Sequence, residues 1–118
     1  MLYVAAWLRA FLITVGVELL VAGLLLRRDE PSWLRRGGLI FFAQAASHPA
    51  VWFIFPELRL GSEKTLFLSE SWAVLSETLF YGLVFRGLGA RRAFGVAALA
   101  NGASYGVGLL LHRSGLLG

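Results

Sequence analysis

The sequence predicts an all-α protein of the membrane, built as a bundle of four helices that cross the bilayer. Of its 118 residues, 58% are hydrophobic and 15% are charged, whereas an average soluble domain is about 45–50% apolar and about 25% charged. A domain this small needs polar residues to cover the large share of its surface that stays in water. The composition therefore argues against a soluble globule, and the lack of charge runs or Ser/Pro tracts argues against a disordered chain.

Four apolar segments are long enough to cross about 30 Å of hydrocarbon, which takes roughly 20 residues of helix. We expect the spans at about 4–26, 37–55, 66–85 and 93–111. Each should be a helix, because an open strand edge would leave backbone groups unpaired in lipid. Short connections make neighbouring helices antiparallel, and the whole chain, 1–118, is expected to form a single transmembrane domain.

Charged residues or proline mark the end of each span in turn. The first span carries Arg9 and Glu18 inside it and stops at a charged run, and the second stops at a proline. The third and fourth spans are each followed by basic residues. The corresponding stops are residues 27–31, 56–59, Arg86 and 112–113.

The basic residues also indicate the orientation, since they concentrate on the cytoplasmic side of a membrane protein. The first and third connections hold seven arginines, and the opposite side holds four basic residues. We therefore expect both termini outside the cytoplasm. Trp7, Trp33 and Trp52 lie near the ends of their spans, as interfacial anchors do.

Other features of the composition exclude several classes of function. The chain has no cysteine, which rules out a disulfide framework, thiolate metal sites and thiol catalysis. Its net charge of +4 comes from residues grouped between apolar segments, so we expect no nucleic-acid partner. No nucleophile–base arrangement, phosphate-binding glycine loop or nucleotide motif is present, which favours a protein that is not an enzyme.

The two halves of the chain, about 1–58 and 62–118, share a pattern of polar residues. Residues 15–27 align with 74–86 at an offset of 59, with six identical pairs among 13; in the second helix of each half the offset is 57. The alignment pairs Glu18 with Glu77, Gln44 with Asn101, and Ser47 with Ser104. Coincidence among low-diversity membrane helices is the alternative, but the aligned polar residues favour an internal duplication. Each repeat is a two-helix hairpin, so the copies should be parallel and related by a pseudo-two-fold axis along the membrane normal.

The arrangement resembles small bacterial four-span membrane proteins that carry a Glu-then-Arg helix and an Asn/Gln-x-x-Ser/Thr-x-Pro helix in each half. The matching residues are Glu18 with Arg27, 44–49, Glu77 with Arg86, and 101–105. The fourth helix departs from the pattern, because Gly106 stands where the second helix has Pro49. The resemblance implies the four-span architecture and a place in the inner membrane of a bacterium, and it brings no reaction, ligand or cofactor with it. Small multidrug exporters and fluoride channels fit the sequence less well.

Nine polar residues inside the spans form the candidate site. They are Glu18, Gln44, Ser47, His48, Glu70, Glu77, Asn101, Ser104 and Tyr105. At about 1.5 Å of rise per residue, Glu18, Glu77 and Asn101 lie near the midplane, and His48, Glu70 and Tyr105 lie in the outer half. An ionisable residue at the bilayer centre costs about 2.5–3.5 kcal/mol, so we expect Glu18 and Glu77 to point into the bundle and to serve the function. The amides and hydroxyls suit a ligand site and hydrogen bonding between helices equally well.

His48 raises the alternative of a metal site. With Glu18, Glu70 and Glu77 it could complete an oxygen- and imidazole-rich site for a divalent metal. No ligand pair has a specific metal spacing, and the repeat counterpart of His48 is Tyr105, a poor ligand for most divalent metals. We therefore favour a hydrogen-bonded histidine next to a helix kink at proline and expect no cofactor, with a divalent metal as the alternative.

The sequence favours a small transporter or channel-like protein that binds or passes a small cation or a proton. Glu18 and Glu77 would be the paired midplane acids, Gln44 and Asn101 neutral ligands, and the outer polar residues the approach. Four helices enclose little volume, so we expect a homodimer or a partner membrane protein. Two alternatives stay open: a non-catalytic membrane subunit or assembly factor that binds partner helices, and, less favoured, a membrane-embedded metalloenzyme.

Overall fold

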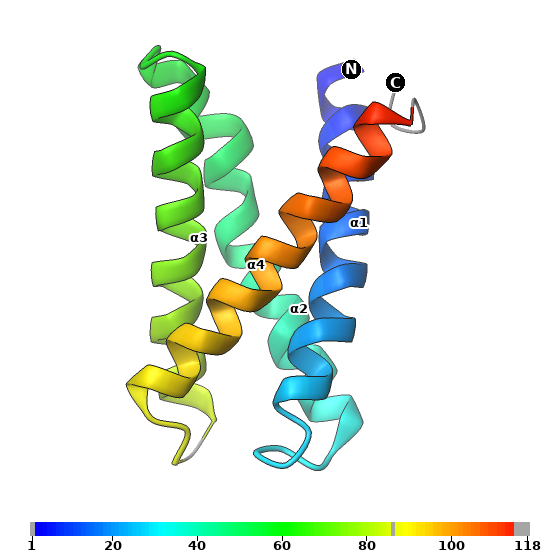
Figure 1. Ribbon diagram of the computed structural model, residues 1–118, viewed down its shortest axis with the longest axis vertical. Coiled ribbons are helices and arrows are strands. Elements are labelled where there is room, and N and C mark those ends of the chain that lie inside the picture. The colour runs from blue at the N-terminus through cyan, green and yellow to red at the C-terminus, as the bar shows by residue number, and fades with distance from the viewer. Residues whose placement is uncertain (1, 86, 115–118) are drawn as a thin grey trace.

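The computed structural model describes residues 2–85 and 87–114, and these residues form helices and turns with no strand. The four long helices are α1 (Leu2–Leu25), α2 (Trp33–Pro49), α3 (Ser62–Val84) and α4 (Ala90–Arg113). They alternate in direction, so the start of α1 and the end of α4 lie on the same side of the bundle (Figure 1). The expected all-α class is confirmed, and each of the four predicted spans overlaps one of these helices.

The helices form a ring in which each one packs against two neighbours. α1 contacts α2 and α4, and α3 contacts α2 and α4. α4 runs obliquely across the bundle between α1 and α3 (Figure 1). The bundle is 39 Å along its longest axis, which exceeds the roughly 30 Å of a hydrocarbon core.

Three helical segments of the described chain are long and apolar enough to cross a membrane. They are Tyr3–Leu25, Trp33–Leu58 and Ala90–Leu111. α3 has 23 residues, or about 34 Å of helix, but it is more polar because its first half carries Glu63, Lys64 and Glu70. These segments support a membrane protein, while the crossing of α3, the orientation and the kind of membrane stay predictions.

The second helix differs from its predicted form on both sides of Pro49. It begins at Trp33, where the Ser32 hydroxyl accepts a hydrogen bond from the backbone N–H of Arg35 (3.3 Å). Beyond Pro49 it continues as a π-helical turn, Ala50–Ile54, and a 3₁₀ turn, Phe55–Leu58. Proline has no N–H to complete the regular ladder. The resulting distortion is a wider, π-helical turn rather than a simple kink. Close to it, Trp72 Nε1 of α3 donates a hydrogen bond to the backbone carbonyl of Ser47 (3.0 Å).

The apolar core occupies one end of the bundle. We call the half next to the connections 26–32 and 85–89 the connection half, and the half next to the two termini the terminal half. The core residues come from the end of α1, the start of α2, the end of α3 and the start of α4. They are Ala22, Leu26, Ile40, Ala43, Tyr81, Phe85, Leu88, Ala93, Val96, Ala97 and Ala100. The connection half is therefore filled by packed side chains.

A strip of small residues on α4 has no close neighbour within the described chain. Ala98, Gly102 and Gly106 have the spacing of a close helix contact. A Cβ atom built on Gly102 or on Gly106 meets no atom within 4 Å. The two glycines therefore lie where no other described helix approaches closely.

Candidate functional site

A buried carboxyl group joins three helices near the middle of the bundle. Glu77 of α3 is 1% exposed. One of its oxygens accepts a hydrogen bond from Gln44 Nε2 of α2, and the other accepts one from Asn101 Nδ2 of α4 at 2.6 Å. The same Asn101 nitrogen also donates to the carbonyl of Ala97 (2.7 Å). Because each amide donates through its nitrogen, its carbonyl oxygen is left as a neutral acceptor.

A second carboxyl group lies beside the first but accepts no hydrogen bond from the described residues. Glu18 of α1 is fully buried, and neither of its oxygens has a hydrogen-bond partner among the described residues. It lies close enough to Glu77 and Glu70 for the carboxyl charges to interact. A buried polar group without a partner costs about 1–3 kcal/mol, and more for a charged group. The two glutamates that the sequence treats as equivalent therefore differ in their surroundings.

Tyr81 borders this carboxyl pair on the side of the connection half. It is fully buried, and its ring packs edge-on against Phe85 at a centroid distance of 5.7 Å. Its hydroxyl lies beside the Glu77 carboxyl but makes no hydrogen bond of regular geometry within the described chain. Phe85, Leu26 and Ile40 are also buried. Apolar side chains therefore cover the carboxyl pair on the side of the connection half.

On the other side, the terminal half holds a cavity of about 270 Å³ that is open at the surface and has both polar and apolar residues in its lining. Its polar lining comes from all four long helices: Thr14, His48, Ser69, Glu70, Asn101, Ser104 and Tyr105. Asn101 belongs both to this lining and to the hydrogen-bond network of Glu77. The cavity therefore leads from the surface to the amide that holds the buried carboxylate.

His48 lines this cavity within a cluster of aromatic residues. Its Nδ1 accepts a hydrogen bond from the indole Nε1 of Trp7 (3.1 Å), and its ring lies 5.4 Å from the ring of Phe11. A neutral imidazole that accepts at Nδ1 carries its proton on Nε2. His48 is thus a hydrogen-bonded histidine with one nitrogen left to donate.

The structure places the nine predicted site residues in the buried centre, along the cavity, or, for Ser47, within its own helix. Glu18, Gln44, Glu77 and Asn101 meet in the buried centre. His48, Glu70, Ser104 and Tyr105 line the cavity, although the Tyr105 side chain is 42% exposed. Ser47 and Ser104 are buried, and their hydroxyls donate to backbone carbonyls of their own helices.

Two residues near the cavity were missed by sequence reasoning. Ser69 is buried and lines the cavity, and it lies eight residues before Glu77, a spacing that places both on one helix face. Trp7 was interpreted as an interfacial anchor, whereas its indole holds His48. Helical spacing from Glu77 could have indicated that Ser69 belongs to the site, but no local sequence pattern indicates that Trp7 donates to His48.

The expected alternative of a metal site finds no ready-made ligand set. Within residues 2–85 and 87–114, no three His, Cys, Asp or Glu side chains lie close enough together to hold a metal ion. The charges of Glu77 and Glu70 reach Glu18, and His48 lines the cavity together with Glu70. The arrangement is a pair of carboxyl groups with amide oxygens nearby.

Comparisons of the chain with protein-family models, with curated proteins and with solved structures found no match.

Proposed function

We propose that this membrane protein binds a small cation or a proton at the Glu18–Glu77 pair and passes it across the bilayer as a small transporter or channel-like protein. The observation that carries the proposal is the Glu18 carboxyl group, which is fully buried and has no hydrogen-bond partner in the described chain. Intramembrane ionisable groups of this kind usually mark ion or proton pathways.

A small cation or a proton supplies the interaction that Glu18 lacks. A proton removes the cost of a buried negative charge, and a hard cation binds carboxylate and carbonyl oxygens. The oxygen donors within the site are the carboxyl groups of Glu18 and Glu77 and the side-chain carbonyls of Gln44 and Asn101. The hydrogen bonds to Glu77 hold this group in position, while Glu18 stays available to the ligand.

The route to the pair lies in the terminal half. The open cavity reaches Asn101, whereas Tyr81, Phe85 and Leu26 fill the connection half. With both termini outside, the ligand enters from the outer face, and release on the cytoplasmic side requires the apolar core to open. His48 and Glu70 line the entrance.

We also propose that the two hairpins derive from a duplication and are related by a pseudo-two-fold axis. Burial supports this proposal, because several aligned positions are buried in both halves. These pairs are Glu18 and Glu77, Ala22 and Tyr81, Leu26 and Phe85, Ile40 and Ala97, Ala43 and Ala100, Gln44 and Asn101, and Ser47 and Ser104. An axis through the bundle would place one contribution from each repeat at the carboxyl pair.

A homodimer, or a complex with a partner membrane protein, is part of the same proposal. Four helices enclose little volume, and Gly102 and Gly106 offer a flat strip that no described side chain covers. Native mass spectrometry in a mild detergent distinguishes the states. A dimer or a stoichiometric partner supports this part of the proposal, and a bare monomer at native expression overturns it.

Ion flux in proteoliposomes tests the function. The purified protein is reconstituted, and uptake of Na⁺, K⁺, Mg²⁺ or protons is followed under an imposed gradient. We expect flux of at least one of these ions in the wild type and its loss in E18Q and in the E18Q/E77Q double variant. E63Q, at the exposed start of α3, is the matched control and should keep the flux. Absent flux in the wild type, or equal flux in wild type and E18Q, overturns the proposal.

A further inference from the structure

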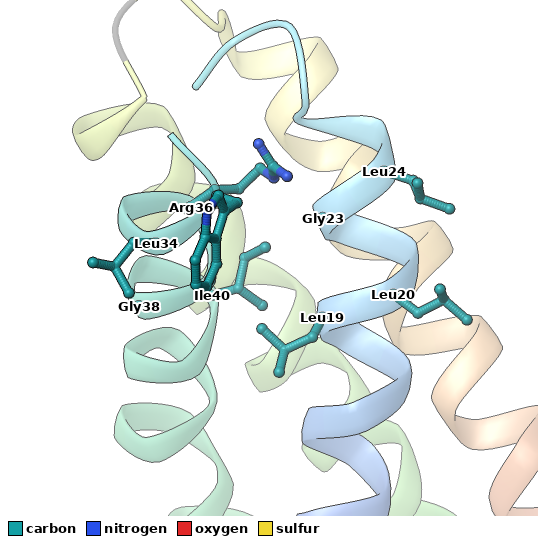
Figure 2. Close-up of a pocket in the computed structure, with 10 residues that line it drawn as sticks. Leu19, Leu20, Gly23, Leu24, Leu34, Arg36, Gly38 and Ile40 are labelled. Carbon is teal, nitrogen blue, oxygen red and sulfur yellow. The ribbon is translucent and has the colours of Figure 1, made fainter. Parts of the chain in front are cut away.

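A second cavity lies on the flank of the bundle, away from the carboxyl pair. It occupies about 430 Å³ between the end of α1 and the start of α2, in the connection half. Its walls are apolar and include Leu19, Leu24, Leu34 and Ile40. Figure 2 shows Leu19 and Ile40 between the two helices and the Arg36 side chain reaching from α2 toward α1. We call this cavity the flank groove.

Three glycines, which have no side chain, leave space in the flank groove. Gly23, Gly37 and Gly38 all line it. A Cβ atom built on Gly23 or Gly38 meets no atom within 4 Å, and one built on Gly37 meets only Leu19 Cδ2 at 3.9 Å. Glycine weakens a helix interior, and the packing of the described chain does not require it at these positions. The space therefore suits an apolar occupant from outside the chain.

The end of the flank groove is basic. Arg36 lines it, and its Nη1 donates to the backbone carbonyl of Glu30 (2.7 Å), which fixes the guanidinium in place. The nearby acids already have partners, since Glu30 pairs with Arg35 (3.2 Å) and Asp29 pairs with Arg92 (2.8 Å). Within the described chain no carboxylate lies at ion-pair distance from Arg36, and the same holds for the neighbouring residues 27–28. The groove thus combines apolar walls with positive charge at one end.

We propose that the flank groove binds an anionic phospholipid, with one acyl chain between α1 and α2 and the phosphate on Arg36. Basic pockets between membrane helices on the cytoplasmic side recognise anionic headgroups, and the positive-inside pattern predicts that this end is cytoplasmic. Trp33, at the start of α2, lines the groove and is 74% exposed, as expected for an indole at headgroup level.

Charge favours a lipid over a second copy of the chain as the occupant. A symmetric dimer brings the same patch of both subunits together. Two copies joined at the flank groove would therefore place Arg36 and residues 27–28 of one subunit against the same cations of the other. A phospholipid with a negative headgroup supplies the opposite charge and an apolar chain in one molecule.

Native mass spectrometry tests the proposal with two lipids of identical acyl chains, phosphatidylglycerol and phosphatidylcholine. We expect the wild type to retain one phosphatidylglycerol and to bind phosphatidylcholine more weakly. R36Q should bind phosphatidylglycerol about fivefold more weakly, the change expected for one basic residue near the surface, and should bind phosphatidylcholine unchanged. Equal binding of the two lipids by the wild type, or unchanged binding by R36Q, overturns the headgroup assignment and with it the proposal.

Groove-filling variants test the position of the chain. G23L places a side chain in the groove and should reduce binding of both lipids, whereas G82L, the aligned position in α3, also has open space around it and should bind like the wild type. G38L serves in the same way should G23L not yield folded protein. Lipid binding that survives both G23L and G38L, or dimerisation through this face in place of lipid binding, overturns the proposal.

Discussion

The two halves of the bundle are built from the same four helices but are filled in opposite ways. In the connection half, Tyr81, Phe85, Leu26 and Ile40 pack with the alanines at the start of α4. In the terminal half, the same helices surround an open cavity whose walls carry polar residues from all four helices among apolar ones. The carboxyl groups of Glu18 and Glu77 lie where the two halves meet.

The difference bears on the proposed access to the carboxyl pair. An interior filled by close-packed side chains admits no water or ion without movement, while an open cavity with polar groups in its wall can hold water. We therefore propose that the pair is reached from the terminal half and is closed off on the side of the connection half.

The largest expected effect is on stability, from removing an aromatic side chain in the connection half. F85A deletes a fully packed ring and should lower the free energy of unfolding by about 3–5 kcal/mol. Y105A removes a ring that is 42% exposed in the terminal half and should change it by less than about 0.5 kcal/mol. Denaturant unfolding in detergent measures both variants. Similar losses would contradict the contrast between the two halves.

The second-largest expected effect is a difference between the two halves in how fast a thiol reagent modifies a cysteine placed inside each. The chain has no cysteine, so single cysteines can be placed without a background. A73C faces the cavity and A97C lies in the apolar core. A membrane-impermeant thiol reagent should modify A73C about 100-fold faster, the factor given by a local opening free energy of about 3 kcal/mol. Equal rates of modification of A73C and A97C would show that the core of the connection half does not exclude the reagent.

The two glutamates should respond differently to the same change. E77Q replaces a carboxylate that accepts two amide hydrogen bonds and should cost about 1.5–3 kcal/mol of stability. E18Q breaks no hydrogen bond of the described chain and should cost little or nothing. Thermal unfolding of the two variants side by side measures the difference. A cost for E18Q as large as that for E77Q would contradict the proposed division of roles.

The smallest expected effect concerns the wall of the cavity. W7F removes the donor to His48 Nδ1 and should cost about 0.5–1.5 kcal/mol. W52F is the control, because the Trp52 indole nitrogen makes no hydrogen bond to the rest of the described chain. The ¹⁵N signals of the His48 ring should shift in W7F and stay in place in W52F. Unchanged signals in both would contradict the hydrogen bond from Trp7 to His48.

Much of the fold and part of the site follow from the sequence, because insertion into lipid imposes strong constraints. The cost of exposing charge to hydrocarbon predicts the burial of Glu18 and Glu77, and helix length predicts the positions of the spans. The unequal partners of these two residues could not be predicted, since an internal repeat makes them equivalent in sequence. Small differences in packing decide that both amides donate to Glu77.

The distortion after Pro49 shows the same limit on a local scale. Proline predicts a break in the regular hydrogen-bond ladder. Whether the helix bends, ends or widens depends on the groups packed around it, here the Trp72 indole at the Ser47 carbonyl. Trp72 lies 25 residues beyond Ser47 along the chain, so no short sequence window around Pro49 contains that information.

The most direct test of the central claim is a ¹³C NMR spectrum of the Glu18 carboxyl carbon in lipid bilayers, assigned with E18Q. The spectrum is recorded across a pH titration and with Na⁺, K⁺ or Mg²⁺ added. We expect the Glu18 signal to shift with protons or with one of these cations when they are supplied on the side of the terminal half. A Glu18 signal that stays unchanged under every condition would contradict it.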